Sequence, residues 1–385
     1  MSSLIVPVVK VDNFKIHPTA DNLDIIVIGG WQVIVKRDQF ALGDVGVYFP
    51  PDCVLEQFLS DKLGVTPYLH KQRVKSIRLR QEVSHGFLAH MDELKDILKK
   101  YKVGDNVAEK LNVKKYEPPI EMKSLIRGGM SHGLPEIAGF AKYTDIENYR
   151  NFTDIFRDID TVYVSEKIHG SNCRVGLVKG VWEVGSHNRR IDIDPSVIKY
   201  FFKYVKQWIK WCIEAKSIVT FKFQLERVKT VYNLPLKDIR VTKMLEKIRD
   251  DYTADSVVLY SEIYGDIQDL KYGRNQGEYD YVVYDISVNG EYLPFITLIT
   301  YCMEHSVPRV PLIIQDIWKN VKCKLNKYAT GNTAVKDRNG NTFIQIKEGI
   351  VIKTVLEERD PKIGRKVLKY ISDDYLTRKK GSELH

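Results

Sequence analysis

The sequence lacks the features of a secreted, disulfide-stabilised or membrane-spanning protein. Its five cysteines are scattered, odd in number and never spaced as C-x-x-C, which argues against a disulfide framework and against a zinc site. The chain does not open with a charged segment followed by a long apolar run, and no stretch approaches the ~20 apolar residues of a membrane span. We therefore expect a soluble, cytoplasmic or otherwise intracellular protein with no membrane partner.

Acidic residues are also in deficit. The 385 residues include 59 lysines and arginines against 50 aspartates and glutamates, a net charge of +9. Hydrophobic residues make up 44% and charged residues 28%, which is typical of a globular protein with roughly two or three domains at this length. The positive surplus favours a polyanionic partner such as nucleic acid, although a merely basic globular protein has the same composition.

The first part of the chain, residues 1–115, consists of short apolar runs separated by glycine and proline. The pattern predicts many short strands and one short helix over 92–100, an arrangement typical of a small closed barrel such as the oligonucleotide-binding (OB) fold. A further strand is predicted at 74–80, with basic residues on one face and apolar residues on the other. The expected strands include 25–28, 31–35 and 45–49.

The remainder divides into a connecting segment and an α+β domain. Residues 116–150 have few periodic apolar runs and several Pro and Gly residues, so they are a linker or an ordered crossing segment. Residues 151–385 predict antiparallel sheets with flanking helices, the second domain of an overall α+β fold. Helices are expected at 195–215, whose aromatic stripe favours core packing over base stacking, and at 236–250. Strands are expected at 161–165, 256–264, 281–288, 342–346 and 349–355, with a hairpin over 175–184.

The segment Glu166-Lys167-Ile168-His169-Gly170-Ser171-Asn172 follows the strand predicted at 161–165. A neutral lysine amine is a nucleophile that can attack phosphorus and hold a nucleotide covalently. Taken alone, a short motif of this kind more often marks an exposed lysine in a turn than a catalytic one. Five polar elements follow it in order, most of them on or beside predicted strands, and they raise its significance: 184–190, 259–265, 281–286, 347–353 and 364–372.

This series resembles the covalent nucleotidyltransferase superfamily of ATP-dependent polynucleotide ligases and mRNA capping enzymes. The EKIHGSN form is similar to RNA ligases, since DNA ligases usually have aspartate in place of His169. Other segments resemble RNA ligases of the Deinococcus/Naegleria type, which carry an N-terminal OB domain before the adenylation domain. The resemblance is least informative over 195–249, a candidate insertion. The segments that carry it are 17–23, 30–35, 43–52, 75–80, 116–119 and 368–372.

The resemblance implies an ATP-dependent RNA ligase that uses Mg²⁺ or Mn²⁺. Lys167 would attack the α-phosphorus of ATP to form a lysyl-AMP, and the AMP would pass to an RNA 5′-phosphate. A 3′-hydroxyl would then attack the activated end and seal the strand. We expect RNA with 5′-phosphate and 3′-hydroxyl ends as the partner, in a nicked duplex and in RNA repair, and a monomeric enzyme.

The resemblance also implies roles for individual residues. Tyr284 would stack on adenine, with Tyr281 as the alternative, and Glu262 would bind the ribose or a metal-bound water. Glu348 would orient the metal through water, as suits the sparse protein ligation of magnesium. The full set expected to contact ATP or AMP is Glu166, Asn172, Arg189, Glu262, Tyr284, Glu348, Lys353 and Lys369.

Three positions depart from the family pattern. His169 replaces the common aspartate, and His187 stands where an arginine is usual, so Arg189 or Arg190 could supply that cation. The last motif reads Lys366-x-x-Lys369, a spacing that puts the two lysines on opposite faces of a strand. In the OB domain, RNA binding is expected at Lys75, Arg78 and Arg80, where a solvated strand face is an equally good interpretation.

Three other functions remain open on the sequence. An mRNA capping guanylyltransferase would usually carry its OB domain after the catalytic domain, whereas here it comes first. A nucleic-acid-binding protein with a decayed transferase domain would not need the intact Lys167, Glu262, Glu348 and Lys369. A DNA ligase is the weakest of the three.

Overall fold

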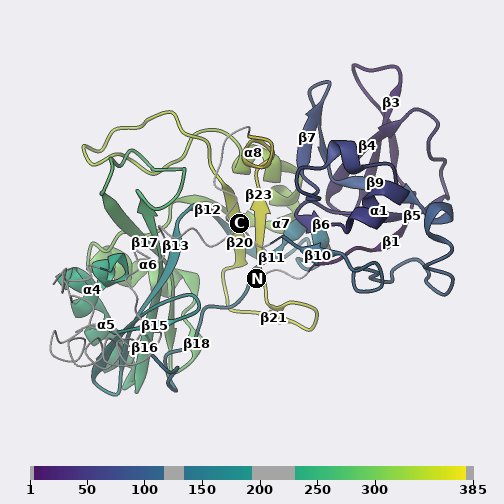
Figure 1. Ribbon diagram of the computed structural model, residues 1–385. Helices are drawn as coiled ribbons and strands as arrows, with labels where there is room; N and C mark the ends of the chain where they lie inside the picture. Colours follow the sequence, from purple (N-terminus) through teal and green to yellow (C-terminus); the bar gives the residue numbers. More distant parts are fainter. Residues whose placement is uncertain (1–3, 117–133, 193–229, 379–385) are drawn as a thin grey trace, which may run out of the picture.

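The computed structural model describes residues 4–116, 134–192 and 230–378, which form two lobes (Figure 1). Residues 4–116 make up one lobe, and most of the remaining described chain makes up the other. The helix predicted over 195–215, with its aromatic stripe, lies outside the described residues, as does much of the predicted connecting segment. No helix in the described ranges is both long and apolar enough to cross a membrane.

The first lobe is a small barrel of short antiparallel strands. Its paired strands are β1 (Val8–Lys10), β5 (Val45–Phe49) and β9 (Phe87–His90); β2 (Phe14–Ile16), β3 (Leu23–Ile28) and β4 (Trp31–Lys36); β7 (Ser76–Leu79) and β8 (Glu82–His85); and β6 (Cys53–Val54) and β10 (Lys114–Lys115). β4 also contacts β8 and β9, which joins the sheets. Two buried clusters fill the barrel, one containing Val47 and Phe49 and the other Trp31 and Val33.

Two predictions for this lobe are wrong. The helix expected over 92–100 is a single 3₁₀ turn, η2 (Met91–Leu94), followed by further turns, and Leu94 and Leu98 reach the core from successive turns. The strand at 74–80 does not separate basic from apolar residues, because Ser76 is buried while Ile77 is 49% exposed. The other helical pieces of the lobe are α1 (Gln57–Lys62) and η1 (Thr66–Tyr68).

The second lobe contains a six-stranded sheet with the order β15-β14-β13-β16-β17-β18. Its strands are β13 (Ser171–Val178), β14 (Val181–Ser186), β15 (Arg190–Ile191), β16 (Ser256–Gly265), β17 (Tyr279–Val288) and β18 (Glu291–Tyr292). The predicted hairpin is confirmed, with β13 and β14 joined by a two-residue turn. Both turn residues, Lys179 and Gly180, have positive φ (49° and 78°), as a tight hairpin turn requires.

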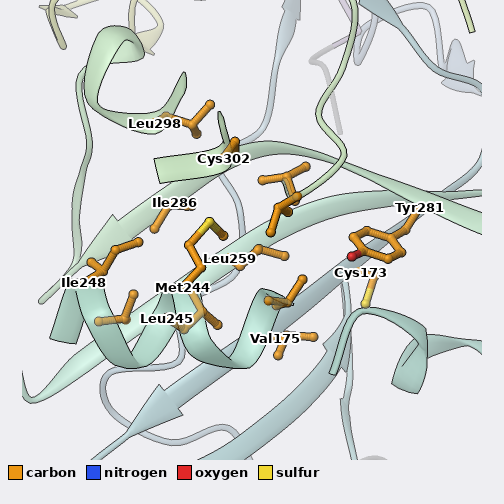
Figure 2. Packing of buried hydrophobic residues seen from close by; sticks show 14 of the residues in the cluster. Cys173, Val175, Met244, Leu245, Ile248, Leu259, Tyr281, Ile286, Leu298 and Cys302 are labelled. Atoms are coloured by element: carbon orange, nitrogen blue, oxygen red, sulfur yellow. The ribbon is translucent and has the colours of Figure 1, made fainter. Parts of the chain in front are cut away.

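Helices cover one face of this sheet. Figure 2 shows Met244, Leu245 and Ile248 of α5 packed toward Val175, Leu259 and Ile286 of the strands. The α5 helix begins where the Asp238 side chain accepts from the Arg240 backbone N–H, and it ends at Thr253 in the left-handed conformation. The helix predicted at 236–250 is therefore confirmed in its main part. The helical elements near this sheet are η4 (Val231–Asn233), α4 (Leu234–Lys237), α5 (Ile239–Tyr252) and α6 (Phe295–Glu304).

A five-stranded sheet with the order β11-β23-β20-β12-β19 stands beside it. Its strands are β11 (Glu147–Asn148), β12 (Thr161–Lys167), β19 (Leu312–Ile317), β20 (Gly349–Thr354) and β23 (Val367–Ile371). One face packs against Trp318, Val321, Leu325 and Ala329. The remaining elements are η3 (Tyr149–Asn151), α7 (Trp318–Val321), η5 (Lys322–Lys324), α8 (Leu325–Ala329), the pair β21 (Arg359–Asp360) and β22 (Gly364–Arg365), and α9 (Asp373–Leu376).

The strand predicted at 342–346 is wrong. The run is rich in β-branched and aromatic residues, but Ile344 is 93% exposed and only an isolated bridge links Ile346 to Asn332. Phe343 and Ile346 pack instead against a small cluster beside the main sheets. Strand-forming residues thus lie here in a loop that places two apolar side chains inward without pairing along a strand.

Candidate active site

A cavity of about 220 Å³ lies where the two sheets of the second lobe meet. The five-stranded sheet contributes residues from β12, β20 and β23, and the six-stranded sheet contributes residues from β13, β16 and β17. Part of the crossing segment closes the cavity. The lining residues are Tyr143, Thr144, Asp145, Ile146, Ser165, Glu166, Lys167, Ile168, Asn172, His187, Glu262, Tyr284, Val310, Val351, Lys353 and Lys369.

Lys167 is the last residue of β12, where the strand reaches the cavity. Its Nζ lies 2.6 Å from Oε1 of Glu348, which directly precedes β20, and its side chain is 25% exposed. Burial alone would raise the pKa of the Glu348 carboxyl, but Lys167 and His169 beside it lower that pKa to about 2. Glu348 is therefore a fixed anion behind the lysine.

The turn after Lys167 needs its glycine for space. A Cβ on Gly170 would lie 2.1 Å from the carbonyl oxygen of Ile263 on β16, so the turn packs its backbone directly on that strand. The Gln268 side chain donates to the carbonyl of Gly170 and holds the turn. The close approach leads the chain into β13, where Asn172 pairs with Glu262 of β16.

Two polar groups of the six-stranded sheet face the cavity together. Burial raises the pKa of Glu262 to about 8, although Lys167 opposes this shift. Asn172 donates from Nδ2 to the Tyr284 hydroxyl, while its Oδ1 is buried and has no hydrogen-bond partner among the described residues. A buried amide oxygen without a partner is a position where a ligand donor would fit.

Tyr284 and Tyr281 lie on opposite faces of β17. Tyr284 lines the cavity, and its ring meets that of Tyr143 edge-on, with centroids 4.9 Å apart. Tyr281 belongs to the core below, and its hydroxyl donates to Oδ2 of Asp238, the N-cap residue of α5. The structure does not place Tyr281, the alternative for stacking, at the cavity.

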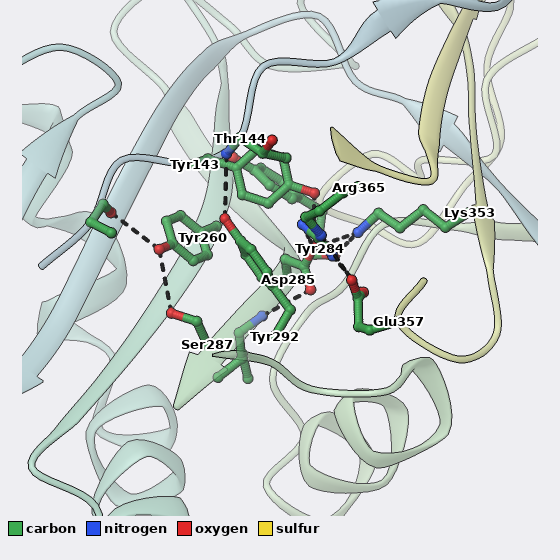
Figure 3. Close-up of polar contacts among 12 residues, drawn as sticks. Tyr143, Thr144, Tyr260, Tyr284, Asp285, Ser287, Tyr292, Lys353, Glu357 and Arg365 are labelled. Carbon is green, nitrogen blue, oxygen red and sulfur yellow. Dashed lines mark hydrogen bonds and ion pairs between the residues drawn. The ribbon is translucent and has the colours of Figure 1, made fainter. Parts of the chain in front are cut away.

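Lys353 and Lys369 both line the cavity but have different surroundings. Lys353 Nζ lies 2.6 Å from Asp285 Oδ2, an oxygen that also accepts from Arg365 and Tyr143 (Figure 3). Burial lowers the pKa of Lys353, and Asp285 opposes this effect. For Lys369, burial and the charge of Lys167 lower the pKa to about 8.

Lys366 does not reach the cavity. Its Nζ contacts Asp160 Oδ2 at 3.2 Å and Glu358 Oε2 at 2.8 Å, on the far side of the strand from Lys369. The three-residue spacing thus separates the two lysines.

The predicted contact of Arg189 with the nucleotide is not supported by its position. Arg189 is exposed and absent from the cavity lining, because the turn after β14 bonds its backbone N–H to the Ser186 hydroxyl and directs it outward. Arg190 binds Glu183 through two hydrogen bonds of 2.6 and 2.7 Å. His187 is the member of the trio that lines the cavity.

Glu166 and His169 support the lysine from two sides. The Glu166 carboxylate accepts from the Thr333 hydroxyl and the Ala334 backbone N–H, at 2.5 and 2.8 Å, and burial raises its pKa. His169 is buried outside the cavity lining, with Nε2 2.7 Å from Asp269 Oδ1. Burial lowers the pKa of His169, but Asp269 and Glu348 outweigh this and raise it above the ordinary value.

Sequence reasoning missed the part of the cavity formed by residues 143–146. These residues precede β11, and Phe140 and Tyr143 pack on the six-stranded sheet. The segment has no apolar periodicity, so its contribution depends on long-range packing. The one local signal was its richness in aromatic and β-branched residues.

The two lobes are fastened beside β23. The Arg150 guanidinium lies 5.1 Å from the Trp31 ring of the barrel and 4.3 Å from the Tyr370 ring, and it contacts Asp373 at 2.5 Å. Of the three residues predicted to bind RNA, Lys75, Arg78 and Arg80, all are exposed. Arg78 forms an ion pair with Asp374 of α9 at 2.8 Å, so it bridges the lobes.

Comparisons with known proteins identify the family and the fold. An RNA ligase family model matches residues 160–371, and an OB-fold domain model matches residues 5–91. No curated protein matches the chain. These matches, together with the solved structures below, confirm the predicted α+β fold with an N-terminal OB barrel.

Solved structures similar to this chain include variants of the Naegleria gruberi RNA ligase. One variant with ATP and Mn has a TM-score of 0.69 and 21% identity, covering 97% of this chain and 98% of that chain. A variant with AMP and Mn has a TM-score of 0.68 and 21% identity over the same shares. The ligase with PPi has a TM-score of 0.67 and 21% identity, covering 97% of both chains. At this identity the likeness establishes the fold.

Proposed function

The chain belongs to the RNA ligase family, and on that premise we propose that it joins RNA ends with ATP through a lysyl-AMP on Lys167. The observation that carries the proposal is the place of Lys167, partly exposed in a cavity and held 2.6 Å from Glu348. Lys353 and Lys369 line the same cavity. A nucleophile surrounded by cations and one fixed anion suits attack on a phosphate.

In the proposed first step, the Lys167 nitrogen bonds to the α-phosphorus of ATP, the bond to the β-phosphate oxygen breaks, and pyrophosphate leaves as the amine loses a proton. An RNA 5′-phosphate oxygen then attacks the same phosphorus, breaks the N–P bond and returns Lys167 as an amine. In the last step a 3′-hydroxyl attacks the activated 5′-phosphate, loses its proton and releases AMP. Each step is a displacement at phosphorus, so positioning and charge neutralisation dominate.

We propose that the other cavity residues divide the nucleotide among them. Tyr284 stacks on the adenine, Glu262 accepts from the ribose, and Asn172 offers its unpartnered Oδ1. Lys369, with Lys353 behind it, neutralises the α-phosphate. His187 replaces Arg189 in this scheme, because it is the residue that lines the cavity.

The residues present also fit a divalent metal ion held through water. Glu348 Oε2 is buried and accepts no hydrogen bond among the described residues, although His169 Nδ1 lies 3.6 Å from it, and Glu262 is a second carboxyl group close by. Mg²⁺ retains waters and needs few carboxylates, so two such groups would suffice to hold it through water. A bound ion would supply positive charge against the phosphates.

The domain limits and partners are part of the proposal. We assign residues 1–115 to the OB domain, 116–150 to a crossing segment and 151–385 to adenylation. Residues 143–146 make the crossing segment part of the nucleotide site. The partner is RNA with 5′-phosphate and 3′-hydroxyl ends in a nicked duplex, in RNA repair, and the enzyme acts as a monomer.

Incubation with labelled ATP and a divalent ion, followed by peptide mapping, tests the proposal. We expect one AMP on the peptide that contains Lys167, no label in Lys167→Ala, and full label in the control Lys179→Ala, which alters an exposed hairpin turn. Labelling by GTP alone would support a guanylyltransferase. Absence of any label with retained RNA affinity would support a decayed nucleic-acid-binding protein.

A further inference from the structure

Two segments of the chain contain lysines and arginines but no acidic residue. One runs from Lys62 to Gln81 in the OB domain, and the other from Ile317 to Lys336 in the adenylation domain. A third such run, 195–213, lies outside the described residues, and over the whole chain 59 basic residues stand against 50 acidic ones. Single-sign segments of this kind create a local positive field. The second segment has no role in the proposed chemistry beyond the contact of Thr333 with Glu166.

The second segment folds as a basic amphipathic surface. From α7 to α8 its apolar residues Trp318, Val321, Leu325 and Ala329 are buried against the five-stranded sheet. Its lysines, by contrast, point into solvent. Lys322 pairs with Asp158 at 2.6 Å, whereas no ion pair within the described ranges involves the other three exposed lysines of the surface, Lys319, Lys324 and Lys327.

The two basic segments are linked indirectly, through α9 and Lys347. Arg78 of β7 binds Asp374 of α9, and the α9 N-cap residue Ser372 donates to the Lys347 carbonyl. Lys347 in turn donates from Nζ to the carbonyl of Tyr328 in α8. In the view of Figure 1, β7 and α8 accordingly lie on the same upper side of the molecule, on either side of the lobe boundary.

We propose that the exposed face of residues 318–329, here called the α7–α8 surface, binds the phosphate backbone of the RNA. The inference rests on the proposed function and extends it with a binding surface in the adenylation domain. Lysines without acidic partners can neutralise phosphates without first breaking an ion pair, and they release counterions as they do so. Exposed bases of the OB segment lie across the lobe boundary, although Lys62 and Arg78 there already have acidic partners, so RNA would be held by both domains.

The position of the surface sets what it can affect. α7 and α8 pack on β12, β20 and β23 through Val162, Ile352 and Leu368, which alternate along the strands with the cavity residues Lys353 and Lys369. The α7–α8 surface therefore lies on the face of the sheet opposite to the cavity. It would hold RNA away from the reacting ends, so its loss should weaken RNA binding and leave adenylation unchanged.

The test uses the full-length enzyme with Lys319, Lys324 and Lys327 all changed to Gln. A matched control changes the exposed lysines Lys179, Lys237 and Lys243 to Gln, which removes the same charge from the other side of the same domain. The probe is a nicked RNA duplex with a 5′-phosphate at the nick. We expect the first variant to bind it about tenfold or more weakly, with a salt slope smaller by about 2 to 3, as lost phosphate contacts predict. The control should match the unmodified enzyme.

Adenylation by labelled ATP distinguishes a failure of the α7–α8 surface as an RNA site from a failure of the proposed ligase function. If the unmodified enzyme takes label and seals the nick, but the triple variant binds RNA like the control, the α7–α8 surface is not an RNA site and the ligase function stands. If the unmodified enzyme neither takes label nor seals, the proposed function fails first. Folding is checked by the label itself, which should be equal in both variants.

Cys323 provides a second measurement that needs no variant. Among the described cysteines it is the exposed one, and it lies between Lys322 and Lys324 on the α7–α8 surface. We expect saturating nicked RNA to slow its alkylation severalfold, as followed by mass spectrometry of its peptide, and high salt to remove the protection. An unchanged rate under saturating RNA would overturn the proposal and would favour an acidic protein as the partner of this surface.

Discussion

The two walls of the cavity differ in chemistry. All three lysines that line it, Lys167, Lys353 and Lys369, come from the five-stranded sheet, whereas the six-stranded sheet contributes Glu262 and Tyr284 together with Asn172. The first wall therefore suits phosphates and the second a nucleoside. A nucleotide lying between the sheets would place its phosphates against the five-stranded sheet and its base and ribose against the six-stranded sheet.

The lysine wall is itself divided. Lys353 is neutralised by Asp285 within a buried group that also contains Arg365 and Glu357, two cations with two anions (Figure 3). Lys369 has no such carboxylate within the described ion pairs, and burial with Lys167 lowers its pKa to about 8. The difference indicates that Lys353 mainly shapes the wall, while Lys369 presents its charge to the ligand.

The largest effect should come from the shared anion of this wall. Asp285→Ala leaves Lys353 and Arg365 buried with Glu357 as their remaining partner, and breaking a buried ion network typically costs about 3–5 kcal/mol. We expect that loss in the free energy of unfolding measured with urea. Glu357→Gln, at the more exposed end of the same group, should cost clearly less. Equal and small losses in both variants would show that Asp285 does not hold the wall together.

Lys369 should give the next largest effect, on chemistry rather than on stability. Lys369→Met removes a cation from the phosphate wall and should slow adenylation about 100-fold, the size seen when one electrostatic donor is lost. Because the folded pKa lies below that of an ordinary lysine, the charged form lowers the stability of the fold at neutral pH, so the variant should unfold no more easily. Measurement of labelling rate and urea midpoint checks both. A matched change at exposed Lys362 to Met should leave the rate intact.

Several strand-borne residues that the sequence singled out lie together in the structure. Lys167, Glu262, Tyr284 and Lys369 lie on strands whose apolar patterns were readable, and the strands carry these residues to one cavity because the register is fixed by burial. The OB barrel and the antiparallel sheets were predictable for the same reason. The choice of Tyr284 over Tyr281 came from the resemblance to RNA ligases, and alternation predicted only that the two rings face opposite sides of the strand.

The rest depended on contacts that no local pattern encodes. The outward direction of Arg189 is set by a turn bond to Ser186, and the neutralisation of Lys353 requires β17 and β20 to meet across the two sheets. Residues 143–146 reach the cavity through packing of a segment without periodicity. The strand-forming residues around Ile344 also gave a wrong prediction, because a loop can contain such residues without pairing like a strand.

Two tyrosine variants test whether one face of β17 serves nucleotide binding and the other serves stability. Tyr284→Leu should raise the KM for ATP about tenfold, since stacking of a base on an aromatic ring contributes roughly 1–3 kcal/mol, and should also cost about 1 kcal/mol of stability, because its hydroxyl accepts from Asn172. Tyr281→Phe should lower the free energy of unfolding by about 1 kcal/mol through loss of the bond to Asp238, and leave the KM unchanged. Calorimetry and ATP titrations distinguish them. A KM effect in Tyr281→Phe would mean that the two faces of the strand are not independent.

The smallest effect should be a pH dependence from the nucleoside wall. Burial raises the pKa of Glu262 to about 8, above the ordinary carboxyl value of 4.5, so the folded protein keeps a proton that the unfolded chain releases. Stability should therefore fall as pH rises from about 5 to 8, and level off above. Because the cavity admits water, we expect this contribution to be only about 1 kcal/mol. Glu262→Gln should flatten the dependence of the urea midpoint on pH over that interval. Glu93→Gln, an exposed control in the OB domain, should keep that dependence. If the dependence stays as steep in Glu262→Gln, a group other than Glu262 retains the proton.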